Sequence, residues 1–435
     1  MSVYPRNLST FLNRMSNYNK NNVKMNVLGS AAASDGDVIQ VDLPTNSIVD
    51  LSSLAWSFRA TYNGAAGNAD PINGEVTFPL NAESIISRLA VEVNGQTLVN
   101  LQNYNMLYHA LLYMTATEDY QLQRRVAQTN IAGNAANGTT LMAASAGGAN
   151  VAEVRRHVID TWLGFLGSAK PNFIDTSLLG NVRISITLAG TDIIGLKAAG
   201  GAFAKSYTVD QQAFSVDVIS IGDGFYDGMV DQMLASGAPM EIPFKNYFSY
   251  SGDLANGAVP FNVASQSIDR MWGLTRLDDY TTNDNNAKHL AVTNYVEAKD
   301  LVAHTPAAFT FKQNGHEGFH FQVNNTLYPQ WTSTYSDDWW QHNKLALNDQ
   351  GNMLAGSHVN TLGAYSNNFF IYVCQLEHRT DGDERFLSGI DTRGAAAQCY
   401  FKASGAATAA ATTTVFAECT SSLRIFSNKV LEVVQ

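Results

Sequence analysis

The sequence predicts an all-β protein built from two consecutive antiparallel β-sandwiches with a few short helices. Segments of alternating or wholly apolar residues, rich in β-branched and aromatic side chains, recur between Gly, Asn, Pro and Asp. Few helical segments separate them, which favours antiparallel pairing over a doubly wound parallel sheet. A repeated order of elements in the two halves of the chain predicts two sandwiches rather than one.

The expected strands alternate with a period of two or are apolar throughout, and the expected helices are short. Strands are predicted at 37–43, 54–63, 88–95, 181–190, 213–222, 369–376 and 423–434, and helices at about 103–125 and 336–347. Loops rich in Ala, Gly, Asn and Thr are expected at 126–153, 277–289 and 393–414. Such loops belong on an outer surface, either as disordered decoration or as contacts with other subunits.

The repeat consists of a strand, an Asn turn and a helix. In the first half, LSSLAWSFRATYN from Leu51 precedes a turn at 93–95 and then NYNMLYHALLYM. In the second half, SIDRMWGLTRLDDY from Ser267 precedes a turn at 323–325 and then SDDWWQHNKLAL. Asn-Gly and Asn-Asn accept the positive φ of tight hairpins. With a break at GAPMEIP, the expected parts are an N-terminal arm at 1–34, a first sandwich at 35–236 and a second at 237–435.

Composition and charge indicate a chain much of whose uncharged surface is covered by neighbours. Hydrophobic residues make up 45% of the 435 residues and charged residues only 15%, which is low for a wholly solvated surface. The net charge is −11, yet no acidic residue precedes Asp35, so the arm is basic. The arm lacks the apolar core of a signal peptide, and no later segment reads as a membrane span. Three cysteines cannot all pair within one chain, which suggests a reduced intracellular environment.

The stretch FTFKQNGHEGFHFQVNN contains a formal match, from His316 to His320, to the H-E-x-x-H pattern of zinc proteases. That chemistry needs a helix, which places both imidazoles on one face and a Glu beside the zinc-bound water. Here aromatic residues alternate as in a strand, and Gly315 and Gly318 disfavour a helix. We therefore expect two aromatic strands joined by a turn at Gly315, and a zinc hydrolase is the less favoured hypothesis.

A second candidate, the sequence DDWW at 337–340, places paired acids beside aromatic rings, as a sugar site would. Carboxylate pairs of glycosidases come together in space, however, and adjacent acids at a helix start usually stabilise its positive end. A β-sandwich carbohydrate-binding or carbohydrate-cleaving protein remains the alternative to a structural protein. No catalytic residue, cofactor or metal is predicted.

The segment FPLNAESIISRLAVEVNGQTLVNLQNYNMLYHALL resembles the double jelly-roll major capsid proteins of tailless double-stranded-DNA viruses. This group includes adenoviruses, tectiviruses, giant-virus relatives, virophages and polinton-like viruses. The chain's length is most like that of polinton-like and virophage members, and it lacks the two glycines that the giant-virus form usually has at 94–95. The resemblance is carried by Val91, Val93, Asn94, Gly95, Tyr104, Leu107 and Tyr108, and by a strand of V-x-I-x-I type at Val182, Ile184 and Ile186.

The resemblance implies a structural protein and no enzyme: two eight-stranded jelly rolls side by side, three chains in a pseudo-hexagonal capsomer, and capsomers tiling an icosahedral shell. It also implies a virion location after assembly in the host cell. Expected partners are other copies, penton and minor capsid proteins, and an internal membrane or the genome, with no small-molecule substrate. The arm is expected either on the inner face of the shell or as a solvated tail. Its candidate contact residues are Tyr4, Arg6, Arg14, Lys20 and Lys24.

Overall fold

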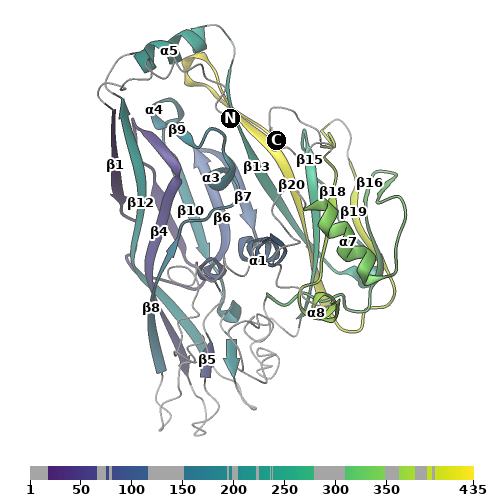
Figure 1. Ribbon diagram of the computed structural model, residues 1–435. Helices are drawn as coiled ribbons and strands as arrows, with labels where there is room; N and C mark the ends of the chain where they lie inside the picture. The colour runs from purple at the N-terminus through teal and green to yellow at the C-terminus, as the bar shows by residue number, and fades with distance from the viewer. Residues whose placement is uncertain are drawn as a thin grey trace, which may run out of the picture.

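Two β-sandwiches lie side by side, the first drawn in purple to teal and the second in teal to yellow (Figure 1). The structure is a computed structural model. It describes residues 18–65, 75–77, 81–115, 151–193, 195–197, 204–221, 225–235, 237, 239–278, 309–347, 362–377, 389–393 and 397–435. Most of the expected loops at 126–153 and 277–289 therefore lie outside the described residues.

The first sandwich has two main sheets, with strand orders β1-β12-β4-β8 and β3-β10-β6-β7, and all pairs between these strands are antiparallel. Short strands β2 and β9 extend the first of these sheets, and β5 pairs with β11. The strands are β1 (Tyr18–Met25), β2 (Ala33–Ser34), β3 (Val38–Asp42), β4 (Ile48–Ala65), β5 (Glu75–Thr77), β6 (Ile86–Val93), β7 (Gln96–Gln102), β8 (Val151–Ile159), β9 (Phe173–Asp175), β10 (Val182–Leu188), β11 (Gly195–Lys197) and β12 (Ala204–Ile221).

The second sandwich repeats this arrangement, with strand orders β13-β20-β15-β18 and β14-β19-β16-β17, again antiparallel throughout. A last strand, β21, pairs with β20. The strands are β13 (Met240–Gly252), β14 (Ala258–Phe261), β15 (Ile268–Leu277), β16 (Glu317–Val323), β17 (Thr326–Tyr328), β18 (Ile371–Gln375), β19 (Cys399–Ser404), β20 (Ala411–Ile425) and β21 (Leu431–Val434).

Both sandwiches are jelly rolls, because their main strands follow one order. Numbered along the chain, the eight main strands of each sandwich pair as 1-8-3-6 in one sheet and 2-7-4-5 in the other. The first and last strands of each roll therefore lie side by side, β1 with β12 and β13 with β20. The prediction of two eight-stranded antiparallel jelly rolls is confirmed.

The predicted repeat occupies the same place in both rolls. Asn94 (φ 48°) and Gly95 (φ 80°) form the hairpin turn between β6 and β7, and Asn324 (φ 53°) starts the turn between β16 and β17. A helix follows each hairpin, α1 (Tyr104–Thr115) in the first roll and α7 (Ser336–Ala346) in the second. Strand, Asn turn and helix thus recur in the predicted order.

Three segments differ from the expectations. The sequence did not predict β1, in the expected arm, which pairs with β12 along its whole length; its Asn and Lys residues hide the strand pattern, as is common at solvent-exposed sheet edges. The Ala- and Thr-rich loop expected at 393–414 contains β19 and the start of β20, because Thr suits a strand and β19 is paired on both sides. The expected break at 237–243 contains the start of β13; the division of the chain there stays a prediction.

Short helices cover the ends and edges of the rolls. None of the described helices is long and apolar enough to cross a bilayer. Besides α1 and α7 they are α3 (Phe165–Ser168), α4 (Thr176–Leu179), α5 (Phe225–Ala235) and α8 (Leu362–Asn368), with 3-10 turns η1 (Ala82–Ile85), η2 (Thr191–Ile193), η3 (Leu254–Asn256) and η6 (Ser427–Lys429).

The two rolls meet where β13 lies against β7 and α3 (Figure 1). The side chain of Asn103 donates a hydrogen bond to the Ser249 hydroxyl at 3.0 Å, and the ring of Phe165 packs edge-on against Phe244 with centroids 5.2 Å apart. Beside α1, the ring of His109 stacks on Phe309 at 3.9 Å. Apolar packing and hydrogen bonds together hold the rolls against each other.

Candidate functional site

The H-E-x-x-H match does not form a metal site. Glu317 starts strand β16 rather than a helix, and His316 before it is 2% exposed, with burial lowering the pKa of its imidazole. Nδ1 of the half-buried His320 lies 3.1 Å from the carbonyl oxygen of Gly318. No three His, Cys, Asp or Glu side chains within the described ranges are grouped to hold a metal ion. The prediction of a strand over helix is confirmed for this stretch.

The turn before β16 is also as predicted, but the segment before the turn differs. Asn314 (φ 57°) and Gly315 (φ 78°) form the turn. Phe311, expected in a paired strand, forms an isolated parallel bridge with Phe369. Gly318 (φ 60°) lies in a bulge opposite β19, which interrupts the alternation. The prediction of two aromatic strands joined at this turn is therefore wrong for the strand before the turn. Strand β16 forms its hairpin with β17, which follows it in the chain.

The acidic pair of DDWW lies in the first turn of α7, as predicted for acids that stabilise the positive end of a helix. The hydroxyl of Ser333 donates a hydrogen bond to Asp338. Trp339 is 1% exposed and its indole donates to the Ser333 carbonyl oxygen at 2.9 Å. Asp338 and Trp339 therefore order the chain that enters the helix, which favours a structural role for these two residues over a sugar site.

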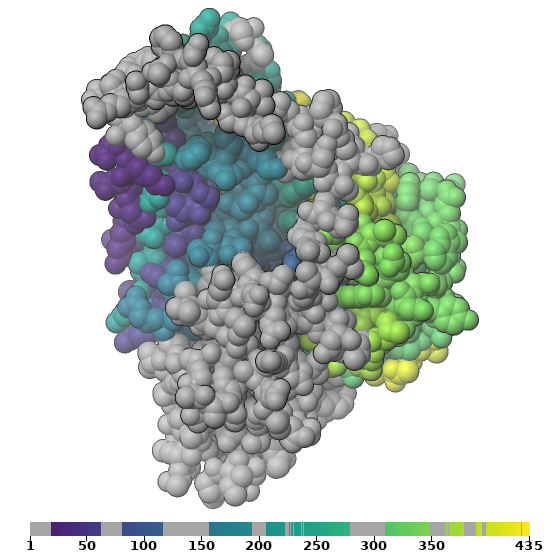
Figure 2. Space-filling model, viewed as in Figure 1, coloured from purple at the N-terminus to yellow at the C-terminus, as the bar shows by residue number. Residues whose placement is uncertain are grey.

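An exposed apolar surface surrounds α7 on the second roll. Trp331 is 54% exposed, Tyr335 70% and Leu345 61%, and Leu362 on the neighbouring α8 is also exposed. We call these four residues the α7 surface. The green atoms of residues 309–347 form an open face of the molecule in Figure 2. Exposed aromatic and large apolar side chains of this kind are typical of protein interfaces.

Of the five arm residues proposed from the sequence, Tyr4, Arg6 and Arg14 lie outside the described residues, and Lys20 and Lys24 lie on β1. The Nζ of Lys20 is 2.8 Å from Asp217 on β12 and 3.5 Å from Asp50 on β4. The hydrogen bond with Asp217 raises the pKa of Lys20 and lowers the pKa of Asp217. Lys20 is therefore used to hold β1 on its own sheet.

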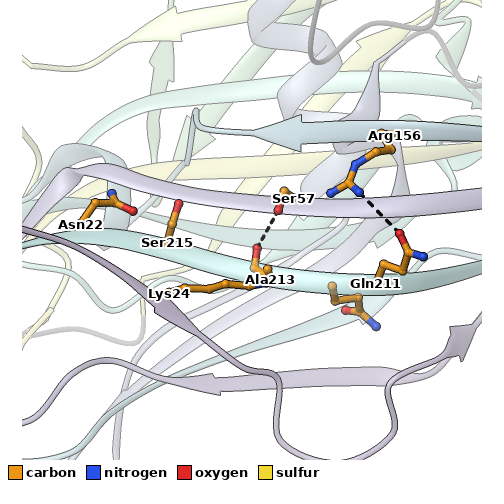
Figure 3. A pocket seen from close by; sticks show the side chains of 8 residues that line it. Asn22, Lys24, Ser57, Arg156, Gln211, Ala213 and Ser215 are labelled. Carbon is orange, nitrogen blue, oxygen red and sulfur yellow. Dashed lines mark hydrogen bonds between the residues drawn. The ribbon is translucent and has the colours of Figure 1, made fainter.

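Lys24 lies instead at a hollow on the outer face of the first roll (Figure 3). The hollow measures about 460 Å³ and draws its residues from four strands that are far apart in the sequence. Sequence reasoning found Lys24 but no other part of it, because only the sheet pairing brings these strands together. We call it the β1 hollow; its lining residues are Asn22, Lys24, Ser57, Arg156, Gln211, Gln212, Ala213 and Ser215.

A cluster of charged side chains is buried in the second roll. The Arg270 guanidinium donates to Glu418 at 3.1 Å and to Glu377 at 2.7 Å, and the Nζ of Lys245 is 2.8 Å from Asp269. Burial raises the pKa of Glu418, whose side chain is 0% exposed. We call these five residues the charge cluster. The sequence signal was a charged residue inside an apolar strand, as in SIDRMWGL, which does not reveal its partners.

Comparison with known proteins gives matches of fold. The PBCV-1 virus capsid structure matches with a TM-score of 0.58 and 13% identity, over 96% of this chain and 97% of that chain. The Sputnik virophage structure matches with a TM-score of 0.54 and 11% identity, over 96% and 88% of the chains. The Faustovirus major capsid protein matches with a TM-score of 0.53 and 9% identity, over 93% and 90%. No protein-family model and no curated protein matches the sequence. The chain has the double jelly-roll fold of these capsid proteins over nearly its whole length.

Proposed function

We propose that this protein is a structural major capsid protein and not an enzyme. The observation that carries the proposal is the match of both jelly rolls together, in order, to a viral capsid structure over 96% of this chain. A match of one sandwich would support little, because β-sandwiches serve many functions. Two rolls of one strand order in a single chain make a subunit with two similar halves. Three copies around a threefold axis then present six similar rolls, which gives a pseudo-hexagonal capsomer.

The surface supports assembly rather than catalysis. Charged residues make up only 15% of the chain, and the α7 surface exposes Trp331 and Tyr335, residue types that are enriched at interfaces. The proposed capsomers tile an icosahedral shell around a double-stranded-DNA genome. The protein is then made and assembled in the host cell and resides in the virion.

Within this proposal the chain divides into an arm, a first roll up to 236 and a second roll from 237, with β1 assigned to the first roll. We infer that the arm contacts the inner side of the shell through Tyr4, Arg6 and Arg14. Its partners there are neighbouring capsomers, penton or minor capsid proteins, or an anionic surface such as an internal membrane or the genome. No small-molecule substrate or cofactor has a role.

Light scattering on a size-exclusion column tests the proposal directly. We expect a trimer of three times 47.2 kDa, or 141.6 kDa, and hexagonal particles in negative-stain images. A stable monomer at all concentrations would contradict the proposal. A monomer that binds immobilised polysaccharide would favour the alternative of a β-sandwich carbohydrate protein.

A further inference from the structure

The junction between the two rolls joins two different sides of a jelly roll. The second roll contributes its first strand, β13, and the first roll contributes its fifth strand, β7, with Asn103 between β7 and α1. Asn103, immediately before α1, donates to Ser249 on β13 at 3.0 Å, and Asn246 on β13 donates to the Leu98 carbonyl oxygen on β7 at 3.4 Å. Each roll therefore has a first-strand side and a helix side.

One first-strand side and one helix side have no partner among the described residues. On the first roll it is the side of β1, where residues 19–24 are all exposed and no described strand pairs with the outer edge. On the second roll it is the side of α7, where Tyr335, immediately before the helix, is 70% exposed. The junction can thus be repeated between copies, with the β1 side of one copy against the α7 side of the next. Such a head-to-tail contact gives a closed ring when the rotation from one copy to the next divides evenly into a full turn.

The charged residues around the β1 hollow show that its lining lacks a carboxylate. Elsewhere on the same sheet two cations have a carboxylate of their own chain: Lys20 pairs with Asp217 at 2.8 Å, and the Nε of Arg59 donates to Asp210 at 2.6 Å. The lining of the hollow contains two cations and no carboxylate.

The two cations of the hollow are Lys24 and Arg156. The side chain of Lys24 makes no hydrogen bond or ion pair with any residue in the described ranges. The side chain of Arg156 reaches only the Gln211 side-chain oxygen there, at 3.5 Å (Figure 3). Unlike Lys20 and Arg59, these cations are left to bind an anion from outside the described chain.

The amide of Gln212 in the same hollow indicates that the ligand is polar. Both its amide nitrogen and its amide oxygen are buried and have no hydrogen-bond partner among the described residues. Buried polar groups are normally paired, so a group with both a donor and an acceptor would complete the site. Gln212 lies in a bulge between Asp210 and Ala213, where Gln211 has a φ of 48°. Bulges and positive φ at non-glycine residues are concentrated at binding sites.

The helix side offers the matching carboxylate. Asp337 is exposed in the first turn of α7, and its carboxylate makes no hydrogen bond or ion pair with the described chain, whereas Asp338 beside it accepts from Ser333. In the junction within the chain, the residue before α1 lies on β13, so the repeated junction places the start of α7 on β1.

We propose that the β1 hollow of one copy binds Asp337 of the next copy, with Lys24 and Arg156 around its carboxylate and the Gln212 amide on the neighbouring backbone. The α7 surface then packs along β1. A second copy of this chain is the favoured partner because the chain carries 38 acidic against 27 basic residues. Two cations are too few for a nucleic-acid backbone, which typically takes about 6–10 contacts. This inference rests on the proposed self-association and names one contact within it.

A double-mutant cycle across the contact tests the proposal. Lys24→Met removes one of the two cations around the Asp337 carboxylate, and Asp337→Asn leaves both cations without their anion. Each change is expected to raise the dissociation constant of the oligomer about tenfold or more. The double variant is expected to be no weaker than either single variant, and the charge swap Lys24→Asp with Asp337→Lys to recover association. Arg59→Gln, which removes a cation paired within its own chain, is the matched control and should leave association unchanged.

The variant Gln212→Leu distinguishes an effect on association from an effect on folding. It removes a buried amide without a partner, so the thermal midpoint should be unchanged or higher while association weakens. An oligomer that forms normally in Lys24→Met, Asp337→Asn and Gln212→Leu would overturn this contact and leave the proposed function standing. A wild-type chain that stays monomeric overturns both.

Discussion

Replacing Arg270 alone is expected to destabilise the second roll more than replacing Arg270 together with its partner. The Arg270 side chain is 1% exposed and that of Glu418 is 0% exposed, so Arg270→Met leaves a carboxylate in the core without its cation 3.1 Å away. Breaking a buried ion pair in this way costs about 3–5 kcal/mol. Arg270→Met with Glu418→Met removes both charges of this pair and leaves Glu377 with Lys245, 3.6 Å away. It also leaves the Trp272 indole without its acceptor, which costs about 1–2 kcal/mol.

Denaturant unfolding followed by tryptophan fluorescence measures this difference, since the Trp272 indole contacts Glu418 of the charge cluster. The free energy of unfolding should fall in the single variant and recover most of that loss in the double variant. The loss should also shrink in acid, because burial already raises the pKa of Glu418 and protonation there removes the unpaired charge. A single variant as stable as the wild type, or a double variant that loses the sum of both single effects, would refute the reasoning.

Three further predictions follow from packing, titration and surface. Gly273→Ala places a Cβ 2.5 Å from the Phe401 ring and should cost about 1–3 kcal/mol by thermal unfolding, with partial recovery in Gly273→Ala plus Phe401→Leu; an unchanged midpoint would contradict this. Burial raises the pKa of Tyr250 to about 12, so its contribution to stability is full below pH 10 and is lost as pH rises towards 12; ultraviolet titration showing an ordinary tyrosine of pKa 10 would contradict this. Trp331→Ser should weaken oligomer formation by at least about 1 kcal/mol with no change of thermal midpoint, and normal assembly would contradict it.

The parts of the fold that follow the hydrophobic pattern were predictable from the sequence. Strands such as β10, whose residues alternate between buried and half-buried, were predicted because each apolar residue marks the core face. The turns at Asn94 and Asn324 were predicted because few residues tolerate positive φ. Strand β1 was missed because its residues from 19 to 24 are all exposed, so their hydrophobic pattern marks no core face.

The candidate sites were less predictable, because they depend on pairing between distant strands. Lys24, Ser57, Arg156 and Gln212 become neighbours only when four strands assemble in one sheet. The charge cluster shows the same limit, since Arg270 finds Glu418 only through the pairing of β15 with β20. The sequence of one strand shows that a charge is buried. The partner that makes this burial tolerable is known only from how the strands pair.

The treatment of the sheet edges explains why assembly is expected at one side of each roll. The outer edge of β18 is covered by α7, where the Asn343 side chain accepts from the Val373 N–H at 2.8 Å and donates to the Ile371 carbonyl oxygen at 2.5 Å. The edges of β7 and β13 lie against each other. Among the described strands β1 keeps a long open edge, and its Lys and Asn residues oppose indiscriminate pairing with other strands. A partner of β1 must therefore recognise side chains such as Lys24 rather than add another strand, which makes the contact between copies selective.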